Sequence, residues 1–333
     1  MPDGADMPLD PGPMRKLIIQ IPCLDEEETL PVTLSCLPRQ VAGYDTVEWL
    51  VIDDGSSDRT AEVARRHGVD HIIQLSPNQG LARAFLAGLE ASLKADADTI
   101  VNTDADNQYD ASSIPDLVRP ILEGRAQIVV GARPIASIAH FSPVKKLLQR
   151  LGSWAVRMAS GADIPDAPSG FRAIHREAAL RLHLFNDYTY TLESIIQAGR
   201  KNLKIVAVPI RVNGELRPSR LIKSVPSYVR RSLVTILRIF ILYKPLRFFA
   251  LLGVLSLIPG VLIGLRFLAY YAAGQGAGHV QSLILSAILV VTGVVLLIAG
   301  ILADLNAANR QLLEDVRMRL LRLEVERADI RRN

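Results

Sequence analysis

The chain has 333 residues, with 38 lysines and arginines against 34 aspartates and glutamates and a formal net charge of +4 at pH 7. This length suits one α/β domain with an appendage, and so small a net charge does not point to a nucleic-acid partner. The two cysteines, Cys23 and Cys36, form no CxxC pair, which argues against a cysteine-based redox or metal motif. The mean hydropathy of +0.23 is high for a purely soluble protein, and nearly all of the excess lies between residues 246 and 303.

The first half of the chain alternates short apolar runs with helical patterns. Residues 1–13 are rich in Pro, Asp and Gly and lack an apolar run, so we expect a disordered tail there. The pattern that follows predicts strands at 17–21, 48–52, 71–75, 99–103 and 126–130, and helices at 29–37, 60–67 and 81–94. This order is typical of a mostly parallel sheet with helices on both faces, and we expect one such domain over residues 14–220.

Polar, mostly acidic segments follow three of these strands, at 22–28, 53–58 and 104–110. Ligands of open parallel sheets bind beyond the carboxyl ends of the strands, so we expect the site at this edge. Asp104 and Asp106, with Gln108 beyond them, are the most informative residues. Two carboxylates so placed can share Mg²⁺ or Mn²⁺, and the metal can hold a diphosphate. Such triplets are common on protein surfaces; the position after a third apolar strand is what favours a metal site.

Two further segments contain candidates for nucleotide binding. Asp54, after the second strand, is predicted to accept from a ribose hydroxyl or a base N–H, whereas Asp58 is more simply a helix N-cap. Arg83 lies at the start of the predicted helix 81–94, behind a glycine that allows close backbone approach. We expect Arg83 to meet a phosphate.

Three charged residues later in the domain are candidates for phosphate or acceptor binding. If Arg133 and Arg172 come to one pocket, they could hold a diphosphate or a lipid phosphate bidentately, although each could equally form a surface salt bridge. Glu193 heads a predicted helix. It could orient an acceptor or simply favour the helix N-terminus.

The C-terminal third has the pattern of a membrane protein. Residues 221–244 combine apolar residues at helical spacing with basic ones, which favours a helix in the membrane interface over an ordinary surface helix. The region 246–303 holds two apolar spans, at about 247–271 and 280–303, each long enough to cross the hydrocarbon core as one arm of a hairpin. Arg266 would snorkel to the far headgroups or contact another subunit. Residues 304–333 form an amphipathic pattern that fits a short coiled coil or a surface-lying arm.

Charge placement predicts the orientation of this hairpin. The loop at 272–279 contains no Lys or Arg, whereas Lys244, Arg247 and Arg310 lie at the opposite ends of the spans. By the positive-inside rule both termini and the α/β domain face the cytoplasm of an inner-membrane protein.

The polar motifs, taken together, resemble the family 2 glycosyltransferases, which have the GT-A fold. The matching segments run in order from Leu17 to about Ser224: IPCLDEEETL, VIDDGSSD, NQGLARAFLAG, DADNQYD, VVGARP and SGFRA. With the hairpin, the chain is similar to the polyprenyl-phosphate glycosyltransferases of that family, which include dolichol-phosphate mannose synthases and bacterial undecaprenyl-phosphate glucosyltransferases.

The resemblance implies a role for each matching residue. The nucleoside would be contacted by Pro22, Leu24, Glu26 and Asp54. The metal and diphosphate would be held by Asp104, Asp106 and Gln108, and the phosphates of donor or acceptor would be faced by Arg133 and Arg172. The lipid phosphate would be met by Ser219 and Arg220, where the family has Ser-Lys-Leu, and by the family's upstream arginine, for which Arg211 and Arg217 both qualify.

The resemblance also implies the reaction. A single sugar would pass, with inversion, from a UDP- or GDP-sugar to a polyprenyl phosphate, using Mg²⁺ or Mn²⁺, for cell-envelope glycan synthesis. The chain contains no QxxRW motif, so one sugar per turnover is expected. The expected partners are the nucleotide-sugar, the polyprenyl phosphate and membrane lipids. Further copies of the chain could also bind, as in a homo-oligomer. A nucleic-acid partner is not expected.

Three other functions fit parts of the pattern. A transferase acting on a diacylglycerol or ceramide hydroxyl would need a base, for which Asp166 or Glu193 is available. A non-catalytic membrane scaffold predicts loss of the acidic strand ends, which are all present. A nucleotidyltransferase should show a Gly-rich, Lys-bearing loop after the first strand, where this chain has Asp25-Glu26-Glu27-Glu28.

Overall fold

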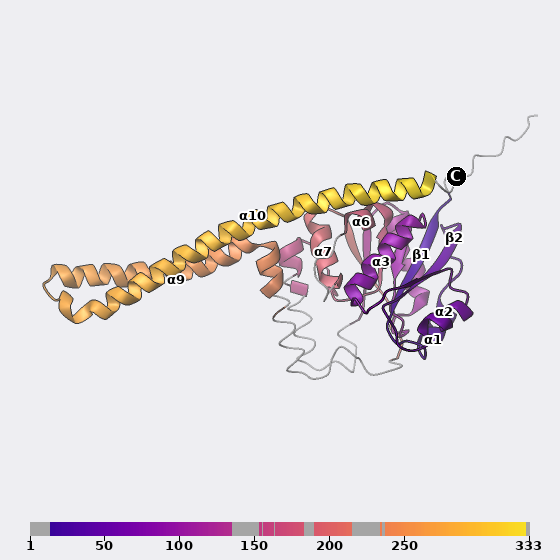
Figure 1. Cartoon of the computed structure of the whole chain (residues 1–333), viewed down its shortest axis with the longest axis horizontal. Helices are drawn as coiled ribbons and strands as arrows, with labels where there is room; N and C mark the ends of the chain where they lie inside the picture. Colours follow the sequence, from indigo (N-terminus) through magenta and orange to yellow (C-terminus); the bar gives the residue numbers. More distant parts are fainter. Residues whose placement is uncertain are drawn as a thin grey trace, which may run out of the picture. The chain divides into compact units, whose positions relative to one another are not determined.

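The computed structural model describes residues 14–134, 153–154, 156–162, 164–182, 190–214, 234 and 237–330 (Figure 1). The chain divides into two compact units. The sheet unit comprises residues 1–223 and 318–333, and the hairpin unit comprises residues 224–317. The predicted tail at 1–13 and most of the predicted interface helix, residues 221–233 and 235–236, lie outside the described residues; residues 237–243 are helical.

A seven-stranded sheet with the order β3-β2-β1-β4-β6-β5-β7 forms the centre of the sheet unit. The strands are β1 (Lys16–Cys23), β2 (Thr46–Asp53), β3 (His71–Gln74), β4 (Thr99–Asn102), β5 (Ile128–Ala132), β6 (Arg172–His175) and β7 (Ile205–Pro209). Every neighbouring pair is parallel except the two that include β6, which is antiparallel to both β4 and β5. The mostly parallel α/β fold predicted from the sequence is therefore confirmed.

Helices cover both faces of this sheet. On one face Leu17, Ile19 and Ile21 of β1 belong to the core that also contains apolar side chains of α1 (Leu30–Cys36) and α4 (Ile114–Leu122). The opposite face is covered by α3 (Leu81–Lys94), which packs on β1 and β2. The other helical segments of the sheet unit are α2 (Thr60–Arg66), η1 (Ala111–Ser113), α6 (Arg176–Arg181) and α7 (Tyr190–Arg200).

The close approach of α3 to the sheet depends on a glycine. A Cβ on Gly88 would lie 2.5 Å from Oε1 of Gln20 on β1 and 2.8 Å from Cδ1 of Ile52 on β2. Any larger residue would push α3 away from the sheet, because interiors packed at this density leave no room for another methyl group.

The strand register brings the polar segments to one edge. Cys23 pairs with Asp53 across β1 and β2, and Gln20 pairs with Asn102 across β1 and β4. Because these strands are parallel, the segments that follow all three leave the sheet at the same end.

Two long helices, α9 (Pro245–Ala272) and α10 (Val280–Ile330), are joined through a short turn, η2 (Gly276–His279). Both are long and apolar enough to cross a membrane, with mean hydropathies of 2.4 and 2.8 in their most apolar windows, which indicates membrane association. The amphipathic pattern at 304–333 lies, as far as residue 330, on the same continuous helix as the second apolar span. The last turns of α10 belong to the sheet unit, where Arg322 pairs with Glu177 at 2.8 Å.

Small residues bring the two long helices together within the hairpin unit. Ser256 Oγ donates to the Leu289 carbonyl at 2.8 Å, and Ser286 Oγ donates to the Gly260 carbonyl at 2.7 Å. A Cβ on Gly293 would lie 2.9 Å from the carbonyl oxygen of Gly253. Apolar helices in a membrane associate through such close backbone contact and interhelical hydrogen bonds, so this packing suits a membrane hairpin.

Replacing Gly293 by leucine should separate the two helices, because the new Cβ would also lie 2.5 Å from Leu257 Cγ. Overpacking of this kind costs about 1–3 kcal/mol. We expect a lower unfolding temperature for detergent-solubilised Gly293→Leu. Val291→Leu is the matched control, since Val291 is 62% exposed and leucine adds volume where there is space. Equal unfolding temperatures for the two variants would contradict this account of the packing.

Candidate active site

Carboxylates from all three acidic segments lie around the end of β1. Burial and the nearby charges of Glu26, Asp53, Asp58 and Asp104 raise the pKa of the Cys23 thiol well above its usual value. These acids come from the segments after β1, β2 and β4. The expected convergence of acidic strand ends at one edge of the sheet is therefore present.

Asp104 and Asp106 form a pair of like charges directly after β4. Burial, and next the charge of Asp106, raises the pKa of Asp104 to about 7, against the opposing effect of Arg133. Within the described residues no N–H or O–H group donates to the Asp104 carboxylate, whereas Asp106 Oδ1 accepts from the Gln108 amide at 3.2 Å. Adjacent hard oxygens that repel each other are the arrangement that a divalent cation stabilises, so these residues fit the predicted metal.

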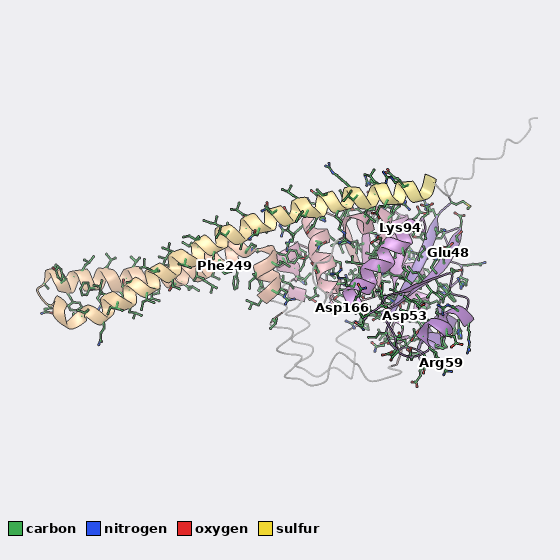
Figure 2. All side chains as sticks on the ribbon, viewed as in Figure 1. Glu48, Asp53, Arg59, Lys94, Asp166 and Phe249 are labelled. Carbon is green, nitrogen blue, oxygen red and sulfur yellow. The ribbon has the colours of Figure 1, made fainter. Side chains whose placement is uncertain are left out.

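Arg133, at the end of β5, lies near Asp104 and is held by Asp166, which is labelled in Figure 2. Its Nε and Nη2 donate to the two Asp166 oxygens at 2.7 and 2.9 Å, and its backbone amide adds a third bond at 3.2 Å. Burial opposes the charge of Arg133, but the bonds to Asp166 outweigh burial and raise the pKa of Arg133. The Asp166 side chain is only 1% exposed. This bidentate pair fixes the guanidinium plane next to the two acids.

Arg172 lies fully inside the sheet unit, although the sequence analysis expected it to face a phosphate. Its side chain donates to the carbonyls of Ser169 and Ala167, each at 2.8 Å, and to Ser194 Oγ on α7. Burial lowers its pKa to about 10. The guanidinium therefore holds the 166–170 loop against α7. The Arg172 side chain has no exposed atoms that could contact a ligand.

Two of the residues expected to contact a nucleoside, Asp54 and Glu26, are bonded to groups of the protein itself. Asp54 is buried, and its two oxygens accept from the amides of Gln79 and Gly80, both at 2.8 Å, ahead of α3. Glu26 is also buried, with its carboxylate bonded to the Thr29 hydroxyl. These bonds shape the loops at the sheet edge.

The remaining candidate site residues differ in how exposed they are. Pro22 is buried, whereas Leu24 and Arg83 are exposed. Glu193 lies buried in the first turn of α7, where its Oε1 accepts from Gln197 at 3.4 Å. Arg211 is exposed. The candidates for the acceptor side, Ser219, Arg220 and Arg217, lie outside the described residues.

Sequence reasoning missed the residues that surround the acidic pair. Tyr109 and Tyr190 are buried beside Asp104, and burial followed by the charge of Asp104 raises the pKa of Tyr109 to about 12 and that of Tyr190 well above its usual value. Tyr190 lies 86 positions after Asp104 in the sequence, so no local pattern could reveal the contact.

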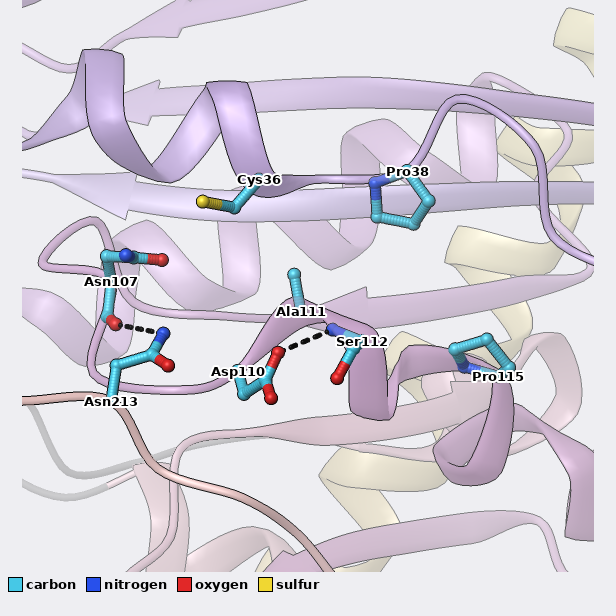
Figure 3. A pocket seen from close by; sticks show the side chains of 8 residues that line it. All are labelled: Cys36, Pro38, Asn107, Asp110, Ala111, Ser112, Pro115 and Asn213. Carbon is cyan, nitrogen blue, oxygen red and sulfur yellow. Dashed lines mark hydrogen bonds between the residues drawn. The ribbon is translucent and has the colours of Figure 1, made fainter.

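The loop at residues 104–110, which carries the acidic pair, borders a cavity of about 450 Å³ (Figure 3). Asn213, which follows β7, bonds back to this loop: its Nδ2 donates to the Asn107 carbonyl and its amide to the Gln108 carbonyl, each at 2.9 Å. Asn107 has a positive φ of 55°, a conformation that asparagine tolerates better than most residues. Asn213 therefore ties the segment that follows β7 to the loop carrying the acidic pair.

Comparison of the chain with known proteins identifies the family to which it belongs. Residues 18–182 match the family described as Glycosyl transferase family 2. An uncharacterized glycosyltransferase of Mycobacterium tuberculosis is 32% identical over 213 residues, which cover 60% of this chain and 91% of the relative. The chain belongs to glycosyl transferase family 2. It is a glycosyltransferase, and the resemblance seen in its sequence motifs is confirmed.

Other relatives of this transferase have more specific names. The undecaprenyl-phosphate mannosyltransferase of Micrococcus luteus is 29% identical over 219 residues, covering 62% of this chain and 88% of the relative. The polyprenol monophosphomannose synthase of Mycolicibacterium smegmatis is 26% identical over 218 residues, covering 62% and 80%. Among solved structures, a complex of M. tuberculosis glucosyl-3-phosphoglycerate synthase with Mn²⁺, UDP and product superposes with a TM-score of 0.52 at 21% identity, over 68% of this chain and 79% of that one. The structural likeness shows the shared GT-A fold.

Proposed function

We propose that this transferase moves one sugar, with inversion, from a UDP- or GDP-sugar to a membrane-embedded polyprenyl phosphate. The product would be a polyprenyl-phosphate-sugar that donates its sugar to cell-envelope glycans. The relatives named for undecaprenyl phosphate and polyprenol support this acceptor. The observation that carries the proposal is the acidic pair Asp104 and Asp106 facing Arg133, on a chain with two helices able to cross a membrane.

On the donor side, Asp104, Asp106 and Gln108 would hold Mg²⁺ or Mn²⁺. A fold neighbour binds Mn²⁺ together with UDP, which supports a metal of this kind. The described residues contain no cluster of three or more His, Cys, Asp or Glu side chains suited to a metal. Diphosphate oxygens of the donor would share the metal with these residues. The bound metal would neutralise charge on the leaving diphosphate. The nucleoside would be contacted by Pro22, Leu24, Glu26 and Asp54, and Arg83 would contact a phosphate.

On the acceptor side, the attacking atom is a phosphate oxygen that already carries negative charge. It forms a bond to the anomeric carbon as the bond from that carbon to the nucleoside diphosphate breaks, so no proton has to be removed. Arg133, held in one plane by Asp166, would bind a phosphate through its remaining Nη1. Ser219 and Arg220, with Arg211 or Arg217, would meet the lipid phosphate. Positioning and electrostatic stabilisation would supply most of the rate enhancement.

A hydroxyl acceptor such as diacylglycerol or ceramide is less well supported, because it needs a general base. Both oxygens of Asp166 already accept hydrogen bonds from Arg133. Glu193 is buried on α7 and accepts from Gln197. Neither carboxylate is therefore placed to accept a proton from a substrate hydroxyl.

The donor can be identified by product release. Purified enzyme with undecaprenyl phosphate and Mn²⁺ would receive UDP- and GDP-sugars in turn, and free UDP or GDP would be measured. We expect release from one donor that depends on the lipid phosphate. Release at the same rate without lipid would indicate hydrolysis and would argue against transfer to a lipid.

The acidic pair also predicts how metal binding depends on pH. The metal binds the ionised carboxylates, and the pKa of Asp104 is about 7 without it. Lowering the pH from 8 to 6 should therefore weaken Mn²⁺ binding by roughly tenfold, because protons compete for Asp104. Mn²⁺ titration followed by electron paramagnetic resonance at pH 6, 7 and 8 measures this. An affinity that is constant over this range would mean that Asp104 is not a ligand.

A further inference from the structure

The chain passes unusually close to the Asp104 carboxylate at Gly170, in the loop between Asp166 and β6. A Cβ built on Gly170 would lie 3.2 Å from Asp104 Oδ1 and 2.7 Å from Tyr190 Oη. Among the described residues no N–H or O–H group donates to Asp104, so the nearby backbone of Gly170 is a contact that limits where this carboxylate can lie. Gly170 forms one wall of the space that the Asp104 carboxylate occupies.

Both polar groups of Gly170 are held by buried side chains. Its amide donates to Tyr109 Oη at 3.0 Å, and its carbonyl accepts from Asn102 Nδ2 at 2.9 Å. The same Nδ2 group also donates to Tyr190 Oη at 3.1 Å. Asn102 is fixed in turn, because its Oδ1 accepts from Gln20 Nε2 on β1 at 2.8 Å. The position of Gly170 is thus defined from β1, β4 and α7 together.

Ring contacts hold the two tyrosines in place. The Tyr109 ring stacks on Phe171 with centroids 5.1 Å apart, and the Tyr190 ring stacks on Phe85 of α3 at 4.2 Å. The exposed fractions are 6% for Tyr109 and 2% for Tyr190. Two rigid hydroxyls therefore flank the glycine that borders Asp104.

We propose that Tyr109 and Tyr190 are positioning residues for the metal ligand Asp104. They hold Gly170 in place, and Gly170 holds the Asp104 carboxylate in the orientation that binds the cation. The inference rests on the proposed function, since it assumes that Asp104 binds a metal. Residues that orient a metal ligand but do not bind the metal themselves typically change metal affinity by about 10- to 100-fold when they are lost.

The tyrosine-to-phenylalanine variants test this proposal, because they keep the rings and remove only the hydroxyls. We expect Tyr109→Phe and Tyr190→Phe each to raise the dissociation constant for Mn²⁺ by roughly tenfold. Binding would be measured on the full chain in detergent by Mn²⁺ paramagnetic resonance, without donor or acceptor. The spectrum of bound Mn²⁺ should also change, because the ligand geometry changes.

Tyr44→Phe is the matched control. Tyr44 is partly buried, less so than Tyr109 and Tyr190, and its hydroxyl donates to Thr99 Oγ1 at 2.8 Å, at the opposite end of β4 from Asp104. Its loss should lower the unfolding temperature about as much as the other two substitutions and leave Mn²⁺ affinity unchanged. Gly170→Ala is a second variant: its methyl group would lie 2.7 Å from Tyr190 Oη and 3.2 Å from Asp104 Oδ1, so it should displace both groups and weaken Mn²⁺ binding although both hydroxyls are present.

The outcomes separate this inference from the proposed function. Failure of the unsubstituted protein to bind Mn²⁺, or equal binding by Asp106→Asn, would refute the metal site itself. Normal Mn²⁺ affinity and spectrum in the two phenylalanine variants and in Gly170→Ala, beside a loss of binding in Asp106→Asn, would overturn the positioning role alone.

Discussion

Asp106→Asn should abolish sugar transfer while leaving the protein folded. The substitution keeps the size of the side chain and removes one of the two charges that would hold the metal. We expect kcat/KM to fall by roughly a thousandfold or more, since the leaving diphosphate loses its main electrostatic stabilisation. The pKa of Asp104 should also move down towards its usual value, because the charge of Asp106 is one of the causes that raise it. Transfer is measured with saturating Mn²⁺ and labelled donor.

Asp110→Asn is the control for this variant. Asp110 lies four positions further along the same loop, where its Oδ1 accepts from the Ser112 amide at 2.9 Å at the start of η1 (Figure 3). Losing that capping charge should cost about 1 kcal/mol of stability or less. Transfer should stay within about threefold of the unsubstituted enzyme, a change that corresponds to less than 1 kcal/mol in the barrier. Equal losses in the two variants would mean that the loop needs its acidic charge in general and that Asp106 has no special role.

Arg133→Lys should lower transfer by roughly a hundredfold although the positive charge remains. Lysine cannot make the two parallel bonds to Asp166, and it has no planar edge to present to a phosphate. We expect the effect in KM for the polyprenyl phosphate as well as in kcat. Steady-state kinetics at varied lipid concentration separates the two. Arg176→Lys is the control: Arg176 pairs with Asp96, which precedes β4 at the other end of that strand, and its substitution should leave the kinetics unchanged.

A double variant decides what Asp166 does. If Asp166 acts by orienting Arg133, Asp166→Asn combined with Arg133→Lys should be no slower than Arg133→Lys alone, because both changes break the same pair. If Asp166 were the general base for a hydroxyl acceptor, its loss would cost a further factor of about 10²–10⁴ in the double variant. An additive loss of that size would favour the hydroxyl-lipid reaction.

The strands that could be predicted are those with strong local patterns. Strands β1 to β4 were located to within two residues at each end, because their apolar runs are bounded by polar clusters. Strands β6 and β7 were missed. β6 has only four residues, and it joins the sheet antiparallel between β4 and β5, a pairing set by partners far away in the sequence.

The helix that contains the second apolar span, α10, does not end where the amphipathic pattern begins at residue 304. The pattern changes there from wholly apolar to amphipathic, which marks a change of surroundings. Residues 301–330 contain no glycine or proline to end a helix, so α10 continues.

The candidate site was predictable where it depends on local order and not where it depends on tertiary contacts. The acidic pair follows an apolar strand, so its position at the sheet edge could be read directly from the sequence. The buried roles of Arg172 and Asp54 could not, because each bonds to backbone groups whose position only the folded chain defines. The contact of Tyr109 with Gly170 spans 61 residues and is equally invisible in the sequence.

The most direct test of the proposed reaction is transfer of labelled sugar into lipid. Purified enzyme with Mn²⁺ and the donor identified by nucleotide release would receive undecaprenyl phosphate, diacylglycerol or ceramide in parallel reactions. We expect label to enter the organic phase only with undecaprenyl phosphate, as a sugar phosphodiester, and we expect Asp106→Asn to stop this transfer. Label on diacylglycerol or ceramide, or no transfer to undecaprenyl phosphate by an enzyme that still binds the nucleotide, would contradict the central claim.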